Sequence, residues 1–189
     1  MSYMIRKAEK GDLPRIYEIY ETARQFMREN GNHAQWGAGD RPEELLEDDI
    51  SQGDLYVLED AVADEAIIHA VFAFIEGEDP VYLKIEQGSW MVDTEYAAVH
   101  RVASDGTVRN VLEKIMDYCK AQIPHLRIDT HEDNKVMQHV LEKYGFVRCG
   151  SCMCRMEARV LHMSYWKNPN EFLMQNSYKY TFCYYVNLW

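Results

Sequence analysis

The stretch that decides the fold is RIDTHEDNKVMQHVLEKYGF, residues 127–146. It starts with strand-like residues, continues into a polar cluster from His131 to Asn134, and then shows an amphipathic helical pattern that ends at Gly145. Aspartate, as at position 133, is a common helix N-cap, and glycine is common just beyond a helix C-terminus. The stretch therefore predicts a strand, a polar turn and a capped helix, with another strand starting at Phe146.

A second strand–turn–helix unit precedes this one. AAVHRVAS, residues 97–104, predicts a strand, DGT at 105–107 opens a helix, and Pro124 marks its end. A strand, a helix and a further strand of this length suit a crossover between parallel neighbours. The apolar stripe at helical spacing consists of Val108, Val111, Leu112, Ile115, Met116 and Cys119.

The rest of the chain predicts further strands and helices of one domain, with residues 77–96 as a connection of undefined structure. A length of 189 residues with 47% hydrophobic residues is enough for one core. The order of predicted strands and helices predicts a mixed sheet with helices on both faces. The additional predicted elements are strands at 3–8, 55–60 and 65–77, and helices at 12–31 and 41–54.

The composition changes after residue 150. Two acidic and four basic residues follow this position, against 29 and 16 before it, and the segment is rich in Tyr, Met and Cys. We therefore assign residues 1–150 to a single domain and 151–189 to an atypical segment, which forms either the last strands of the domain or an aberrant tail. A frame-shifted ending from about residue 152 is one hypothesis. YKYTFCYYVNLW, residues 178–189, suits a final strand or an exposed, sticky tail.

Charge and cysteine content exclude several classes of protein. A formal net charge of −11 without a basic stripe argues against nucleic acid as a partner. The charged start MSYMIRKAEKGD does not suit a signal peptide, and no apolar run suits a membrane span. An odd count of five cysteines then predicts free thiols and a cytoplasmic location. CMC at 152–154 lacks further ligands, so no metal site is expected.

The layout, the strand AAVHRVAS leading into a helix, and HEDNKVMQHVLEKYGF together resemble the GNAT superfamily of acetyl-CoA-dependent N-acetyltransferases over about residues 3–150. In that family an Asn opens the helix that borders coenzyme A and Gly-Phe leads into the next strand, which here are Asn134, Gly145 and Phe146. HRVASDG followed by a helix also resembles a bacterial subgroup. The resemblance implies an α/β (α+β) fold: a mixed, mostly antiparallel sheet with a central parallel strand pair and helices on both faces.

The resemblance also implies acetyl-CoA as co-substrate. A helix N-terminus offers free N–H groups and the positive end of a dipole to a pyrophosphate. Gly106 permits positive φ or a close approach, and Arg109 adds a cation. The backbone of the preceding strand would hold the pantetheine arm. The expected cofactor-binding residues are Val102, Ala103, Gly106, Thr107, Val108, Arg109, Asn110, Val111 and Asn134.

The sequence departs from the family pattern at two points. TVRNVL stands where a glycine-rich loop is usual, so Val108, Asn110 and Leu112 occupy the glycine positions. Leu141 stands where many members carry a Tyr that protonates the departing thiolate, and Tyr144, one turn later, is either its replacement or a packing residue. These departures leave a second interpretation open, a degenerate acyl-CoA-binding or regulatory module without turnover.

Amide formation also needs a base that deprotonates the acceptor amine. His131, Glu132 and Tyr144 are the predicted catalytic residues. His100 is a further candidate base, or a core histidine that shares a face with Ala98 and Val102.

The predicted acceptor is a primary amine of a small molecule or peptide. An aromatic ring beside carboxylates can hold an ammonium group, so Trp36 and Asp40 are the predicted acceptor-binding residues. The alternative interpretation of this segment is a solvated, acidic helix face. The aromatic C-terminal segment makes a homodimer possible.

Overall fold

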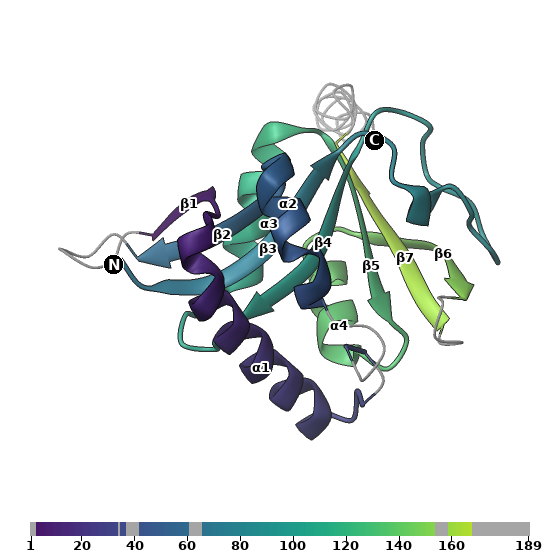
Figure 1. Ribbon diagram of the computed structural model, residues 1–189. Coiled ribbons are helices and arrows are strands. Elements are labelled where there is room, and N and C mark those ends of the chain that lie inside the picture. Colours follow the sequence, from purple (N-terminus) through teal and green to yellow (C-terminus); the bar gives the residue numbers. More distant parts are fainter. Residues whose placement is uncertain (1–2, 34, 37–41, 61–65, 154–158, 168–189) are drawn as a thin grey trace, which may run out of the picture.

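The computed structural model describes residues 3–33, 35–36, 42–60, 66–153 and 159–167, and this part of the chain forms a seven-stranded mixed sheet with helices on both faces (Figure 1). The spatial order of the strands is β1-β2-β3-β4-β5-β7-β6. Among the pairs formed by these residues, only β4 and β5 run parallel. The strands are β1 (Tyr3–Lys7), β2 (Leu55–Asp60), β3 (Ile68–Glu76), β4 (Ala97–Ser104), β5 (His125–His131), β6 (Val147–Met153) and β7 (Arg159–Trp166).

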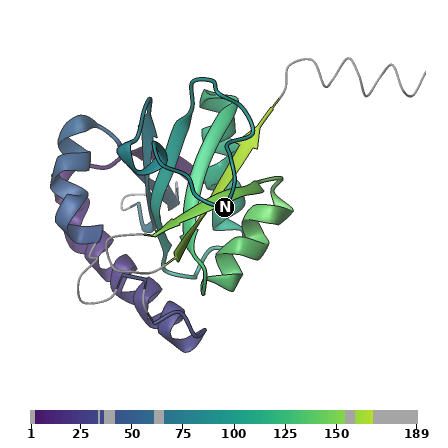
Figure 2. The same ribbon diagram turned by 90° about the vertical axis from the view of Figure 1, so that its right-hand side faces the viewer.

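Two helices cover each face of the sheet (Figure 2). On one face α1 (Leu13–Glu29) and α2 (Leu46–Gln52) bury a core against β2 and β3. On the other face α3 (Val111–Gln122) and α4 (Lys135–Lys143) bury a second core against β4 and β5. The 3-10 helices η1 (Lys10–Asp12), η2 (Pro42–Leu45) and η3 (Pro80–Tyr82) lie in the connections.

The parallel pair is joined for only part of its length. Ala97–Val99 of β4 pair with Leu126–Ile128 of β5. Beyond these residues, the described parts of β4 and β5 do not pair with each other. Figure 1 shows the two strands diverging toward their C-terminal ends. The sheet is therefore split at its centre, and the backbone groups that line the split are left without a strand partner.

A β-bulge in β4 lies beside this split. The β3–β4 register shifts between Val71 and Ala73, and Arg101 has a left-handed backbone with φ 54°. Because a bulge inserts one extra residue, it changes which side chains share a face. Val102 packs on the α3/α4 core, as Val99 does, while His100 stays on the other face. The expectation that His100 and Val102 share a face is therefore wrong.

Two helix starts also differ from the sequence prediction. The third helix begins at Val111 instead of near Thr107, because Asp105 accepts the Thr107 N–H at 2.9 Å and Asn110 has φ 56°. The fourth helix is capped by Asn134, whose side chain accepts the Met137 N–H, and not by Asp133. Gly145 has φ 85° just after this helix, as predicted.

The sheet continues beyond residue 150. Cys152 pairs with Val160 in the β6–β7 hairpin, and β7 lies between β5 and β6. Residues 159–166 are thus an inner strand of the sheet. The strand or tail predicted for residues 178–189 lies outside the described residues, and the frame-shift hypothesis stays a prediction for the gene's nucleotide sequence to test.

Candidate active site

A cavity of about 1150 Å³ occupies the split between β4 and β5. It reaches both faces of the sheet, because its walls come from α1 and the following loop on one side and from α3 and α4 on the other. Polar side chains from the two strands, including His100, Asp129 and His131, belong to its lining. The lining residues that matter below are Phe26, Gln35, Trp36, Leu45, His100, Val102, Ala103, Gly106, Val111, Leu112, Asp129, His131, Asn134, Met137 and Val140.

The cavity extends to the start of α3. The first N–H groups of an α-helix have no acceptor within the helix, and Gly106, Val111 and Leu112 line the cavity beside them. Asn110, which stands at a position where the family has glycine, keeps a left-handed backbone that Asn tolerates better than most residues. Val108 and Leu112 pack on the α3/α4 core. Of these three residues, Leu112 alone belongs to the cavity lining among the described residues.

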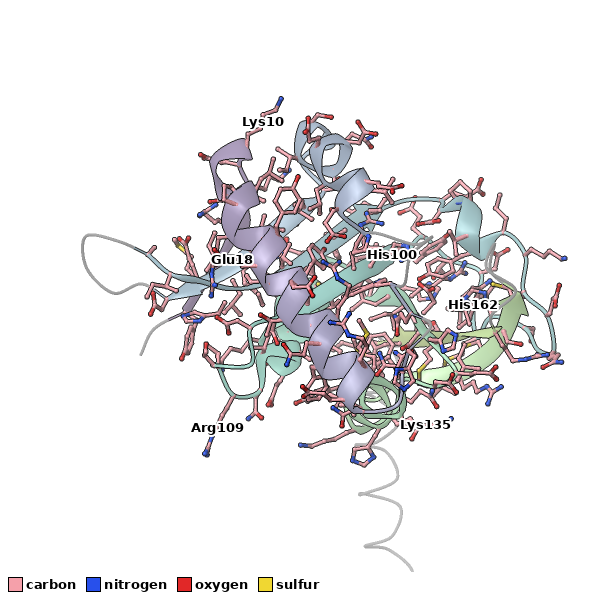
Figure 3. The ribbon with its side chains drawn as sticks, turned by 60° about the horizontal axis from the view of Figure 1, so that its bottom comes forward. Lys10, Glu18, His100, Arg109, Lys135 and His162 are labelled. Carbon is pink, nitrogen blue, oxygen red and sulfur yellow. The ribbon has the colours of Figure 1, made fainter. Side chains whose placement is uncertain are left out.

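The predicted cofactor-binding residues fall into two groups. Five of them line the cavity, namely Val102, Ala103, Gly106, Val111 and Asn134. The other four, Thr107, Val108, Arg109 and Asn110, are not among the described residues that line the cavity. Arg109 is exposed and points away from the body of the molecule in Figure 3.

Hydrogen bonds hold the turn before α3 in place. The Thr107 hydroxyl donates to Asp105 at 2.6 Å, and His69 Nδ1 lies 2.8 Å from the same hydroxyl. Asp105 also forms an ion pair with Arg15, with 2.6 Å between Oδ2 and Nη2. Arg15 balances the negative charge of Asp105. The electrostatic repulsion between Asp105 and an anion bound at the start of α3 is therefore weaker than it would be without this ion pair.

The loop after α1 is tied to the start of α4. The Asn134 amide donates to Gln35 Oε1 at 3.0 Å, and Asn32 donates to the same oxygen at 2.7 Å. Next to Gln35, Trp36 lines the cavity and packs edge-on against Tyr20, with ring centroids 5.3 Å apart. The structure therefore places the predicted Trp36 at the cavity, whereas Asp40 lies outside the described residues.

A histidine between two aspartates marks the point where β4 and β5 separate. His100 Nε2 lies 2.8 Å from Asp79 Oδ2, and His100 Nδ1 lies 3.1 Å from Asp129 Oδ1. The Tyr82 hydroxyl donates to the same Asp129 oxygen at 2.9 Å, and its ring stacks on His100. In Figure 3 His100 lies over the sheet, well away from the exposed Arg109. His100 and Asp129 line the cavity.

This arrangement shifts the protonation of all three groups. Burial alone would lower the pKa of His100, but the hydrogen bonds and charges of Asp129 and Asp79 outweigh it and raise the pKa to about 9. Burial likewise acts to raise the pKa of Asp129, and the hydrogen bond and charge of His100 lower it overall. Burial also acts to raise the pKa of Asp79, but the hydrogen bond and charge of His100 lower it below its usual value. The cluster is thus an imidazolium between two carboxylates at neutral pH, with a net negative charge.

This pKa shift predicts a pH dependence of stability. A histidine whose pKa rises from 6.5 to about 9 on folding contributes stability that is fully present below pH 6.5 and is lost as pH rises through about 9. The shift corresponds to about 3 kcal/mol. The free energy of unfolding, measured with urea, should therefore fall between pH 6.5 and 9 in the wild type. The fall should be larger than the fall measured for His100→Gln over the same pH range. Equal pH dependence of the two proteins would contradict the assignment.

The three predicted catalytic residues lie in different surroundings. His131 lines the cavity, but its Nδ1 accepts the Asp133 N–H at 3.1 Å, so the neutral ring carries its proton on Nε2. Glu132 is exposed, with its carboxylate 4.0 Å from Arg159. The Tyr144 hydroxyl donates to Glu113 at 3.2 Å. Neither Glu132 nor Tyr144 is among the described residues that line the cavity.

Sequence reasoning missed Asp79, Tyr82 and Asp129. Asp79 and Tyr82 lie in the connection from 77 to 96, to which the sequence assigned no structure. Asp129 was part of a predicted strand, HLRID. A carboxylate that ends an apolar parallel strand was the available signal for it, because ligands of open α/β sheets gather at the carboxyl ends of strands.

The part of the chain that the structure describes holds no group of three or more His, Cys, Asp or Glu side chains placed to bind a metal ion. In the same residues no helix has both the length and the apolar character needed to cross a membrane.

Comparison of the fold with known proteins identifies its relatives. Neither a family model nor a curated protein sequence matches the chain. Among solved structures, an acetyltransferase of the GNAT family from Streptococcus agalactiae 2603 matches with a TM-score of 0.78 and 26% identity, covering 88% of this chain and 96% of that one. The ribosomal-protein-S18-alanine N-acetyltransferase from Escherichia coli matches with a TM-score of 0.55 and 15% identity, covering 89% and 98%.

A third match is the NatC complex bound to Gag peptide and CoA, with a TM-score of 0.53, 11% identity, and coverage of 89% of this chain and 100% of that one. The seven-stranded mixed sheet with its parallel β4–β5 pair and four helices is a GNAT-like α/β fold. The chain has the GNAT fold and is a strong structural match to the GNAT family of acetyltransferases, small bacterial members included.

Proposed function

We propose that this protein is an N-acetyltransferase that transfers the acetyl group of acetyl-CoA to a primary amine of a small molecule or peptide by direct attack on the thioester. The observation that carries the proposal is the cavity through the β4–β5 split, which joins the start of α3 to a partly buried carboxylate, Asp129. The structural relatives are N-acetyltransferases, and one of them was solved with CoA, which supports the same chemistry here.

The α3/α4 half of the cavity fits acetyl-CoA, which supplies an acetyl group activated as a thioester. The start of α3 offers N–H groups and the positive end of a helix dipole to the pyrophosphate. Beyond Val99 the edge of β4 that faces the split has no strand partner, so its backbone groups at Val102 and Ala103 are available to the pantetheine arm. Met137 and Val140 of α4 give that arm an apolar wall.

The other half of the cavity fits the acceptor amine. Asp129 Oδ1 already accepts hydrogen bonds from His100 and Tyr82, and no hydrogen bond among the described residues uses Oδ2. That oxygen can receive an ammonium group, which the net negative charge of the cluster attracts. Phe26, Trp36 and Leu45 form an apolar wall nearby, which favours an amine on an apolar body.

Binding and turnover measured together test the proposal. Acetyl-CoA should raise the melting temperature, and thiol release should follow when a panel of primary amines and short peptides is added. Stabilisation without thiol release on any amine would support the alternative, an acyl-CoA-binding module without turnover, which the loop replacements and Leu141 favour. Absence of stabilisation would contradict both. The cytoplasmic location and the possible homodimer stay predictions.

A further inference from the structure

Asp79 and Tyr82 reach the split from the connection between β3 and β4, and the described residues that line the cavity include neither. The Asp79 side chain is only 9% exposed and sits against His100 Nε2. Its other oxygen accepts the Val81 N–H at 2.8 Å, which caps η3 and fixes the carboxylate. Asp79 therefore contacts the groups that line the cavity by way of His100.

The contacts of His100 determine where its proton sits when the ring is neutral. Each ring nitrogen faces a carboxylate oxygen, Nε2 that of Asp79 and Nδ1 that of Asp129. A neutral imidazole has one proton, so one nitrogen presents a lone pair. Asp79 is fixed and more deeply buried than Asp129, whose side chain is 23% exposed. The proton therefore stays on Nε2, and the lone pair of Nδ1 faces Asp129.

We propose, building on the acetyltransferase function above, that Asp79 is a positioning residue that orients His100 to take the proton of the acceptor amine by way of Asp129. Tyr82 supports the geometry by holding the Asp129 oxygen that faces His100. Asp129 is the catalytic carboxylate, because it lines the cavity and no hydrogen bond among the described residues uses its Oδ2.

The protons and electrons balance along this path. The acceptor enters as an ammonium ion and gives one proton to Asp129, which passes a proton to Nδ1 of His100. The amine nitrogen then forms a bond to the acetyl carbon, and the carbon–sulfur bond breaks with its electron pair on sulfur. A second proton from the nitrogen neutralises that thiolate. His100 returns its proton to solvent, so an ammonium ion and a thioester give an amide, a thiol and one proton.

The path requires neutral His100, so the rate should rise with pH. The charged and titratable groups around the ring are Asp79 from the β3–β4 connection, Tyr82 of η3, Asp129 of β5, His162 of β7, and the pair formed by Arg101 of β4 and Asp49 of α2. Removing the charge of Asp79 should lower the pKa of His100, because it removes one of two neighbouring negative charges.

The test combines an NMR titration of His100 with the pH profile of kcat/KM for an amine that the wild type acetylates. Asp79→Asn should lower the pKa of His100 by about 1 to 3 and move the rising limb of the profile to lower pH by the same amount. The KM for acetyl-CoA should stay unchanged. Asp93→Asn, the same substitution at an exposed position of the same connection, is the control and should change neither.

The following results would overturn the inference. One is an unchanged pKa of His100 in Asp79→Asn, and another is a lowered pKa with an unmoved limb, which would identify another group as the proton acceptor. If Asp79→Asn does not fold, His100→Gln replaces it, and persistence of the limb near pH 9 in that variant would overturn the inference. A wild type that binds acetyl-CoA and acetylates amines would leave the proposed function intact in each case. A wild type without turnover on any amine would overturn both.

Discussion

Replacing Asp129 with Asn is expected to lower kcat/KM for amine acetylation by about 10²- to 10⁴-fold, the usual range for general acid–base catalysis. Asparagine keeps nearly the same shape and can still accept the Tyr82 hydroxyl, so the local structure should persist. It cannot take up a proton, and it lacks the charge that attracts an ammonium ion. Steady-state kinetics with the best amine of the panel measures the effect.

The control for this substitution is Asp117→Asn, which removes the same charge from an exposed position on α3. Both variants should bind acetyl-CoA as the wild type does. If Asp129→Asn keeps near wild-type kcat/KM, then Asp129 does not handle the amine's proton, and the acceptor side of the proposal is wrong.

Placing a tryptophan at Val140 is expected to weaken acetyl-CoA binding by at least about 100-fold, which is close to 2.7 kcal/mol. Val140 is half-buried and lines the cavity from α4. An indole there fills the space between α4 and α3 through which the pantetheine arm would pass. Calorimetric titration with acetyl-CoA measures the affinity.

His139→Trp is the matched control, because residue 139 is the neighbouring position on the same helix and is exposed. It introduces the same side chain outside the cavity and should leave the affinity within a few-fold of the wild type. Equal affinities of Val140→Trp and the wild type would show that the cofactor does not occupy this half of the cavity.

Much of the fold follows from local sequence patterns. The stretch from 127 to 146 predicted a strand, a helix and a glycine C-terminus, and all three are present, because hydrophobic period and Gly145 act locally. The parallel pair was also expected, since a connection with a helix of this length suits a crossover between parallel strands. The amphipathic pattern of α4 did not reveal that Val136, Met137 and Val140 line the cavity, because periodicity cannot distinguish a core from a cavity wall.

The parts that could not be predicted depend on contacts between distant segments. The bulge at Arg101 exists because β4 pairs with β3 in a shifted register, which no local pattern reveals. Asp79 and Asp129 are 50 positions apart and are bridged by His100. His131 was chosen as a base on residue type, yet the N–H of Asp133 occupies its Nδ1. Residue type therefore suggested candidates, and tertiary contacts decided their roles.

A crystal structure with bound CoA tests the central claim most directly, because that claim is a position: the cofactor passes through the split between β4 and β5. The account predicts the pyrophosphate at the N–H groups of Val111–Glu113, the pantetheine arm along β4 between α3 and α4, and the thiol directed toward Asp129. Density for CoA elsewhere on the molecule, with the split closed by side chains, would contradict it.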